Sequence, residues 1–360
     1  MGYRKILIKN GRIFDGDRFF DADIFIEKGR IAGIGRYEDS AAHDSDYVID
    51  ADGKLVTPGL VDVHTHIYGV SIDEFGTSAE GCSFPFGVTF VADASARQGS
   101  KATLASHRIG AVVFADTSVK DDNACFENTD SMLDAYGDAV VGVKIFFDTT
   151  GGQVRSIRPL EQVCAYARAH GIKVMVHSSN SPVSMLDIVK TLSKGDILSH
   201  TYHGGVNTCA DDGYAAIKLA KEKGVVVDTG LAGYVHTDFA VLKAAIDSKM
   251  IPDTVSTDIT NLSAFVRGGR YGMTLAMSVM RAVGMEEEAL LRAVSVNAAA
   301  ALGVSERAGR IKVGERADIA VLDYGEYPFD FNINENNTLK ADLGYRCTLC
   351  VCGGQVVYRG

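Results

Sequence analysis

Hydrophobic and polar positions alternate with a period of two at both ends of the chain. The first 55 residues contain such segments between turns rich in Gly and Asp, and residues 309–360 repeat the pattern in GRIKVGERADIAVLDY and TLCVCGGQVVYRG. This alternation predicts short, half-buried β-strands. Chain termini of compact domains often lie close together. We therefore expect residues 1–55 and 309–360 to form one small β-sandwich domain.

The middle of the chain, residues 56–308, has a different pattern, in which short apolar runs alternate with stretches of helical periodicity. Eight runs are candidate strands: LVDVH, VTFVADA, GAVVFA, VVGVKIFF, IKVMVH, DILSH, VVVDT and DTVSTD. Parallel strands that alternate with helices predict an α/β catalytic domain, a (β/α)8 TIM barrel. A doubly wound open sheet is the alternative, but it usually carries a Gly-rich dinucleotide turn, which this sequence lacks.

Composition and charge narrow the classes of function. The chain carries a net charge of −10, which disfavours nucleic acids and anionic membranes as partners, because both bind basic surfaces. The first residues do not resemble a signal peptide, and no apolar stretch reaches the roughly 18 residues of a membrane span. The seven scattered cysteines are typical of a reducing compartment. We expect a cytoplasmic protein that acts on a small molecule; whether it forms a homo-oligomer stays open.

Candidate metal ligands lie at the ends of several predicted strands. His64 and His66 have a spacing of two, so both rings point to the same side of an extended strand. Two converging imidazoles form half of a site for a metal such as zinc. Two histidines satisfied by ordinary hydrogen bonds are the alternative. His177 and His200 end two later runs, and catalytic side chains of a barrel lie at the carboxyl ends of its strands.

Two charged residues extend this set. Asp258 closes the eighth run, where its carboxylate can bind a metal and hold a proton, or merely cap a turn. Lys144 lies inside the fourth run, where an unpaired ammonium is costly to bury. A salt bridge across the barrel mouth would satisfy it. Alternatively, reaction of the amine with carbon dioxide would give a carbamate, whose two oxygens can bridge two cations.

These residues in this order resemble the amidohydrolase superfamily, specifically its binuclear branch with a carboxylated lysine. The resemblance covers nearly the whole chain and includes TPGLVDVHTH and the tail SVNAAAALGVSERAGRIKVGERADIAVLD. It implies two divalent metal ions, most typically Zn²⁺. It also implies that His64, His66 and Asp258 ligate the more buried ion, that His177 and His200 ligate the second, and that carbamylated Lys144 bridges both.

Within the superfamily, GVKIFF, VMVHSSN and DILSHTYHGG look most similar to the deacetylase group. The resemblance implies hydrolysis of an acyl amide or ester bond in an N-acyl or O-acyl carboxylic acid. A hydroxide that bridges the two metals would attack the carbonyl, and Asp258, the catalytic residue, would move its proton to the leaving group. The candidate substrate-binding residues all follow predicted strands: Tyr68, Arg97, Arg155, His203 and Arg267.

Two alternatives stay open. Cyclic amide hydrolysis, of the dihydroorotase or hydantoinase kind, belongs to the same superfamily. Dihydroorotases usually carry an arginine two residues after the second histidine, however, and this chain has Tyr68 there. A catalytically silent barrel that serves as an assembly subunit is the alternative from another class. Such relatives generally lose metal ligands, whereas this chain keeps all six candidate positions.

Overall fold

The computed structural model describes residues 4–37, 44–232, 236–266, 271–334 and 336–360, and both ends of the chain contribute to one small sheet. Its strands follow the order β18-β17-β14-β5-β1-β2-β3, with β4 paired to β1. Most pairs are antiparallel, but β1 runs parallel to β4 and β5. The strands are β1 (Ile6–Phe14), β2 (Phe19–Glu27), β3 (Arg30–Gly35), β4 (Tyr47–Asp50), β5 (Leu55–Pro58), β14 (Ile319–Gly325), β17 (Gly344–Cys352) and β18 (Gln355–Arg359).

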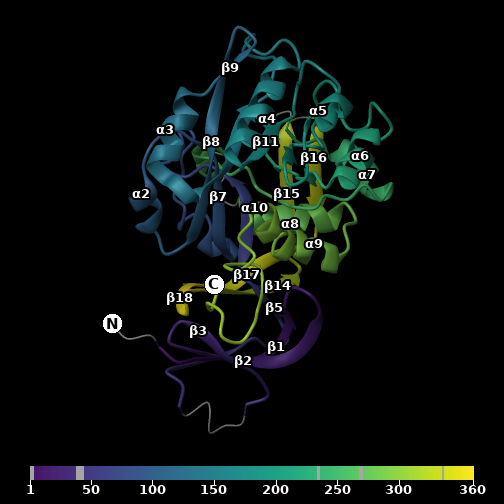
Figure 1. Cartoon of the computed structure of the whole chain (residues 1–360). Helices are drawn as coiled ribbons and strands as arrows, with labels where there is room; N and C mark the ends of the chain where they lie inside the picture. Colours follow the sequence, from purple (N-terminus) through teal and green to yellow (C-terminus); the bar gives the residue numbers. More distant parts are fainter. Residues whose placement is uncertain (1–3, 38–43, 233–235, 267–270, 335) are drawn as a thin grey trace.

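A second, parallel sheet curls into the barrel that lies above the small sheet in Figure 1. Within the described residues its main path is β13-β12-β11-β10-β8-β7-β6, and the short β9 (Asn123–Cys125) pairs antiparallel with β8. These strands match the first seven predicted runs. They are β6 (Leu60–Thr65), β7 (Val88–Ala96), β8 (Gly110–Lys120), β10 (Val140–Phe146), β11 (Lys173–His177), β12 (Ile197–Ser199) and β13 (Val226–Val227).

The eighth predicted run is not a regular strand. Its residues form isolated parallel bridges, from Thr254 to Asp228 on one side and from Ile259 to Thr65 on the other. Side chains replace part of the backbone ladder here, because Asp62 accepts hydrogen bonds from the amide and the hydroxyl of Thr257. The segment nevertheless joins the two edges of the curled sheet.

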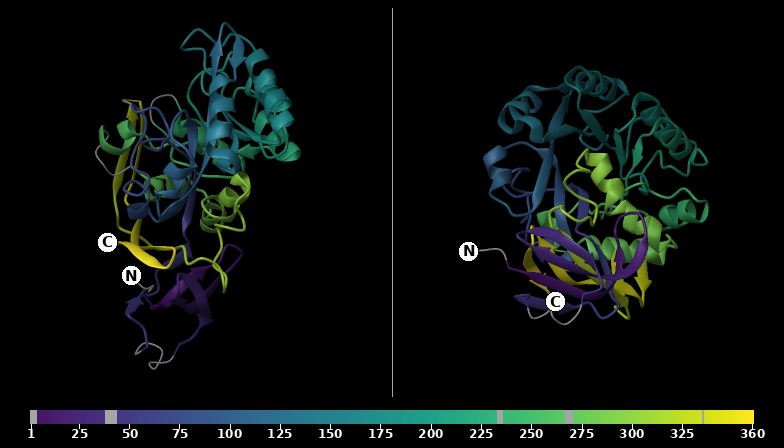
Figure 2. Two further views of the ribbon diagram at one scale, coloured as in Figure 1. Left: turned by 60° about the vertical axis from the view of Figure 1, so that its left-hand side comes forward. Right: turned by 60° about the horizontal axis from the view of Figure 1, so that its bottom comes forward.

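Helices surround the parallel sheet, as the view from below in Figure 2 shows. Local signals set their ends: Asp238 caps α7 by accepting from the amides of Ala240 and Val241, and left-handed Gly171 ends α4. The helices are α2 (Lys101–Ala105), α3 (Glu127–Tyr136), α4 (Arg158–His170), α5 (Met185–Thr191), α6 (Ala215–Lys223), α7 (Phe239–Asp247), α8 (Met273–Ala282), α9 (Glu287–Ala293) and α10 (Val296–Leu302), with short turns at Phe84–Phe86, Gly137–Ala139 and Leu262–Val266. In the described residues, none of the helices is long and apolar enough to cross a membrane.

The carboxyl-terminal segment does more than complete the small sheet. Its hairpin of β15 (Phe329–Asn334) and β16 (Asn337–Ala341) extends along the barrel in Figure 2, and the ring of Phe331 lies 5.7 Å from that of Phe239 on α7. The predicted fold class, an α/β barrel with a small β unit from both chain ends, is confirmed. The exact domain boundaries stay a prediction.

Candidate metal centre

A cavity of about 550 Å³ opens at the carboxyl ends of the barrel strands. All six predicted metal ligands line it, together with one arginine and an apolar rim of aromatic and aliphatic side chains. The lining residues are His64, His66, Ile72, Phe75, Ser95, Arg97, Asp116, Lys144, Phe146, His177, His200, Ala232, His236, Asp258, Thr260, Leu262 and Ser263. The structure therefore brings together residues that lie almost 200 positions apart in the sequence.

Three acceptor atoms converge on one side of this cavity. The Asp258 Oδ1 atom lies 3.2 Å from His64 Nε2 and 3.0 Å from His66 Nε2. Asp258 reaches this place from a left-handed backbone conformation, with φ of 49°. Burial alone would raise the pKa of Asp258, but the nearby His64, His66 and His200 outweigh it and hold this pKa well below its ordinary value.

Hydrogen bonds fix which nitrogen of each imidazole carries the proton. The hydroxyl of Ser199 donates to Asp228, so it accepts from Nδ1 of His64 at 2.8 Å. In the same way the hydroxyl of Ser71 donates to Asp93 and accepts from Nδ1 of His66 at 3.1 Å. Each ring therefore turns the lone pair of Nε2 toward Asp258.

This arrangement fits a cation. Two imidazole lone pairs and one carboxylate oxygen repel one another at about 3 Å unless a positive charge lies between them. A proton can serve when no metal is bound, but two nitrogens and one oxygen are also a suitable donor set for zinc. Support of a metal-ligating imidazole by a hydroxyl or carboxylate at its other nitrogen is common in metal sites.

Lys144 lies beside this cluster on β10. Its side chain is buried, and its Nζ atom lies 3.1 Å from Nε2 of His64. Burial lowers the pKa of Lys144 to about 8, although Asp258 and Asp228 partly oppose this effect. The amine of Lys144 thus loses its proton more readily than that of an ordinary lysine. The alternative of a direct salt bridge finds no support, since no ion pair of Lys144 is present among the described residues.

A second histidine cluster lies on the other side of the cavity. One nitrogen each of His177, His200 and His236 lie within 4.8 Å of one another. His200 donates from Nδ1 to the carbonyl of Gly230 at 2.8 Å, so its Nε2 carries the lone pair. Burial lowers the pKa of His177 and His200 well below the ordinary histidine value, so both are neutral. Nε2 of His177 is buried and has no hydrogen-bond partner in the described structure, as expected for a ligand atom.

His236 is the residue that the sequence interpretation did not include. It follows a predicted strand, but its segment, GYVHTD, equally fits a residue that contacts the next helix. Ser199, Asp228, Ser71 and Asp93 were also absent from the predicted site. Asp228 and Asp93 lie at or near strand ends, which was the one signal available; the serines carry none.

The predicted substrate-binding residues separate into groups. Arg97 lines the cavity and forms an ion pair with Asp116, with a shortest distance of 2.6 Å. Tyr68 is 66% exposed and Arg155 pairs with Asp121, and neither lines the cavity. His203 is fully buried behind it, where its Nδ1 accepts from the amide of Gly205. Arg267 lies outside the described residues.

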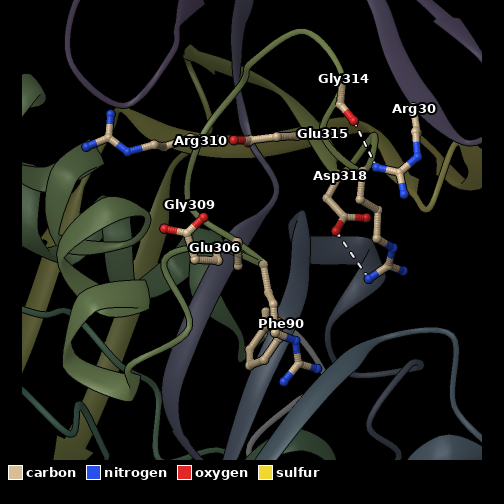
Figure 3. Close-up of a pocket in the computed structure, with 11 residues that line it drawn as sticks. Arg30, Phe90, Glu306, Gly309, Arg310, Gly314, Glu315 and Asp318 are labelled. Atoms are coloured by element: carbon tan, nitrogen blue, oxygen red, sulfur yellow. Dashed lines mark hydrogen bonds and ion pairs between the residues drawn. The ribbon is translucent and has the colours of Figure 1, made fainter.

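Another cavity, of about 430 Å³, lies at the opposite end of the barrel strands, beside the small sheet (Figure 3). Phe90 lines it from the first half of β7, whereas Ser95 of the same strand lines the histidine-rich cavity. Its arginines already have partners within the protein: Arg30 donates to the carbonyl of Gly314, and Arg316 pairs with Asp318. Among the described residues that line it there is no histidine or cysteine. Arg316 also donates to the carbonyl of Arg108, which precedes β8, and so links this end of the barrel to the small sheet.

Comparisons with known proteins identify the family of this chain. The family model described as "Amidohydrolase family" matches residues 55–357. A curated deacetylase of Brucella anthropi is 26% identical over 359 residues, which cover 93% of this chain and 87% of that protein.

Among solved structures, a dihydroorotase has a TM-score of 0.83 at 20% identity, covering 99% of this chain and 98% of the other. An adenine deaminase has a TM-score of 0.81 at 21% identity, with coverage of 99% and 100%. At these identities the two structures establish the shared fold alone. Because the family model spans most of the chain, the protein belongs to the amidohydrolase family of metal-dependent hydrolases that act on C–N bonds.

Proposed function

We propose that this protein is a binuclear metal-dependent hydrolase that cleaves an acyl amide or ester bond in a carboxylic acid substrate. One observation carries the proposal: two clusters of candidate ligands face one cavity, with the buried Lys144 beside them. In this assignment His64, His66 and Asp258 would hold one ion, His177 and His200 would hold the other, and carbamylated Lys144 would be a ligand of both. Nitrogen-rich donor sets of this kind favour Zn²⁺.

The carbamate would form by reaction of the Lys144 amine with dissolved carbon dioxide. The lone pair of the unprotonated Nζ would attack the carbon atom, one C=O π pair would move to oxygen, and the proton released from Nζ would pass to solvent water. The buried amine is predisposed to this reaction because burial disfavours its ammonium form. Compared with the ammonium form of Lys144, the carbamate carries a negative charge in place of a positive one. This anion would lie between neutral imidazoles, where it suits divalent cations.

Bound cations would supply a water that ionises near neutral pH and an electrophile for the substrate carbonyl. The chain's own residues perform the remaining tasks. Asp258, ionised at neutral pH, accepts a proton from the attacking water and delivers it to the leaving nitrogen or oxygen. Phe75, Phe146 and Leu262 on the rim limit the access of bulk water.

The cavity favours a substrate with one carboxylate and an apolar part. Arg97 is the only arginine among the described lining residues. Its Nε and Nη2 atoms both contact one oxygen of Asp116, which fixes the guanidinium in place, and its side chain stays 45% exposed, so a substrate carboxylate would have to bind the remaining N–H groups. Guanidinium groups bind carboxylates through two parallel hydrogen bonds. The apolar rim suits the acyl group or the side chain of the substrate. The likeness to the Brucella anthropi deacetylase supports an acyl amide or ester over a ring imide.

A substrate screen on zinc-loaded protein tests this proposal. N-acetyl amino acids and O-acetyl hydroxy acids form one arm, and ring imides such as dihydroorotate and hydantoins form the other. We expect turnover in the first arm and a large rise in KM when Arg97 is replaced by Ala. Turnover confined to ring imides would favour the cyclic amide alternative. A protein that binds less than about one equivalent of zinc after supplementation would instead fit a silent barrel.

A further inference from the structure

His236 occupies a position that a site with only two histidines does not need. Its ring centroid lies 4.7 Å from that of His177 and 4.7 Å from that of His200. Those two rings are themselves 4.4 Å apart. The three imidazoles therefore form a compact triangle at the cavity wall, with their nitrogens close enough to share one ion.

The orientation of His236 is set from a different strand end. Its Nδ1 atom lies 3.0 Å from the hydroxyl of Ser179, which follows β11 and His177 in the sequence. The ring of His236 is thus fixed at Nδ1, and one of its nitrogens lies within 4.8 Å of a nitrogen of each of the other two rings. His200 shows the same arrangement, with Nδ1 held by the carbonyl of Gly230. Such support of one nitrogen is what orients a histidine ligand toward a metal.

One nitrogen of this triangle lacks a hydrogen bond: Nε2 of His177 is buried without a hydrogen-bond partner among the described residues. The nearest carboxylate that pairs with it, Asp148, has its oxygen at 3.8 Å, too far for a hydrogen bond. A buried nitrogen without a partner is unfavourable, because it has lost its hydrogen bonds to water. An ion held by the three imidazoles would satisfy this atom.

From this geometry we propose that His236 is a third imidazole ligand of the second metal ion. The inference rests on the proposed binuclear function and extends it, because it makes the second site independent of the Lys144 carbamate. Each ion would then have three ligands from side chains other than Lys144: two histidines and Asp258 at one site, three histidines at the other. Three protein ligands with one open position are the usual arrangement of catalytic zinc.

The charge of the two sites would also differ. Asp258 would neutralise one positive charge at the first site, whereas three imidazoles, which bind a metal as neutral ligands, would neutralise none at the second. The second site would thus present the larger net positive charge to the cavity. That is the site expected to attract an anionic or strongly polarised substrate group.

Metal content of the purified, zinc-supplemented full chain tests the proposal without any activity assay. After removal of loosely bound metal, we expect about two equivalents of zinc in the wild type and in K144A. H236A alone also keeps about two equivalents, since the carbamate remains, but the double variant K144A/H236A falls to about one. The matched control is H170A, which removes an exposed histidine on α4 and should change nothing, alone or with K144A.

Chelator competition provides a second measurement if the double variant folds poorly. In the wild-type background, H236A should weaken zinc at the more loosely bound site by at least about tenfold, while the tighter site is unchanged. A drop of K144A alone to one equivalent, or equal zinc affinities of H236A and wild type, would overturn the role of His236 and leave the proposed function intact. A wild-type protein that binds no zinc would overturn both.

Discussion

At the scale of single residues, replacing Asp258 is the most direct test of the proposed proton transfer. Asn in place of Asp258 keeps the shape and one carbonyl oxygen but cannot accept a proton. We expect the turnover of D258N to fall by about 10²–10⁴-fold, with most of the zinc retained. Steady-state kinetics and elemental analysis check this together. The control is D134N, which alters an exposed carboxylate on α3. Near-normal kcat in D258N would contradict the assigned role.

The hydroxyl of Ser199 has a more indirect role, since it links His64 to the buried Asp228. In S199A, Nδ1 of His64 loses its acceptor, so the ring is less well oriented. We expect zinc affinity at the first site to fall by about 10–100-fold, measured by competition with a chromogenic chelator. S118A changes an exposed serine on β8 and should leave the affinity unaltered. An unchanged affinity in S199A would mean that the ring is held by packing alone.

The six ligand positions were predictable because each residue type is chemically unusual at its place. A lysine inside an apolar run and histidines at strand ends stand out in a linear sequence, and the structure brings all six to one cavity. Their binding of metal stays a prediction. Ser199 and Asp228 did not stand out, because a serine or aspartate after a strand is ordinary. Their role depends on a partner across the barrel, which only the fold supplies.

At the scale of elements, the turn after β13 sets the position of the His200 ring. Gly230 has φ of +48°, and a Cβ atom there would lie 2.5 Å from Nδ1 of His200. We expect G230A to displace the His200 ring and to weaken zinc at the second site. We also expect it to destabilise the fold by about 1–3 kcal/mol. Metal analysis and thermal unfolding measure the two effects.

The matched control for this turn is G213A. Gly213 also has a positive φ, of 63°, but a Cβ atom there would meet no other atom within 4 Å. Backbone strain is thus common to both variants, and the clash with His200 is specific to G230A. Equal metal content in the two variants would show that the turn tolerates a side chain.

Periodicity predicted the regular strands well and failed for the segment that closes the barrel. The run DTVSTD alternates like a strand, yet it forms only isolated bridges, since Thr257 and Ser256 give their hydroxyls to Asp62 and Asp228. Polar side chains competing with backbone pairing leave no mark on hydrophobic periodicity. The hairpin β15–β16 lies within residues 309–360, and the packing of its Phe331 on a barrel helix is a contact that periodicity cannot predict.

At the scale of the whole molecule, one hydrophobic cluster includes residues of both the barrel and the small sheet, and a second cluster belongs to the small sheet alone. Phe14 and Leu55 from the amino-terminal strands and Leu322 from β14 belong to the same buried cluster as the barrel residues. Chains of this length often unfold through intermediates. The cluster that includes residues of both parts instead predicts a single cooperative unfolding transition. Because the chain contains no tryptophan, circular dichroism and release of bound zinc are suitable probes, and two separate transitions would contradict this expectation.

A single residue, Gly59, separates β5 of the small sheet from β6 of the barrel. A Cβ atom at Gly59 would lie 2.1 Å from the hydroxyl of the buried Thr89 on β7, so the two sheets meet here without room for a side chain. We expect G59A to lower the free energy of unfolding by about 1–3 kcal/mol while both probes still report one transition. G35A, in β3, adds a methyl group into open space and should be nearly neutral. If zinc release and the loss of secondary structure occurred at different temperatures in G59A, the junction would be a hinge between independent units. If both transitions shift together, the metal centre depends on the small sheet for its stability.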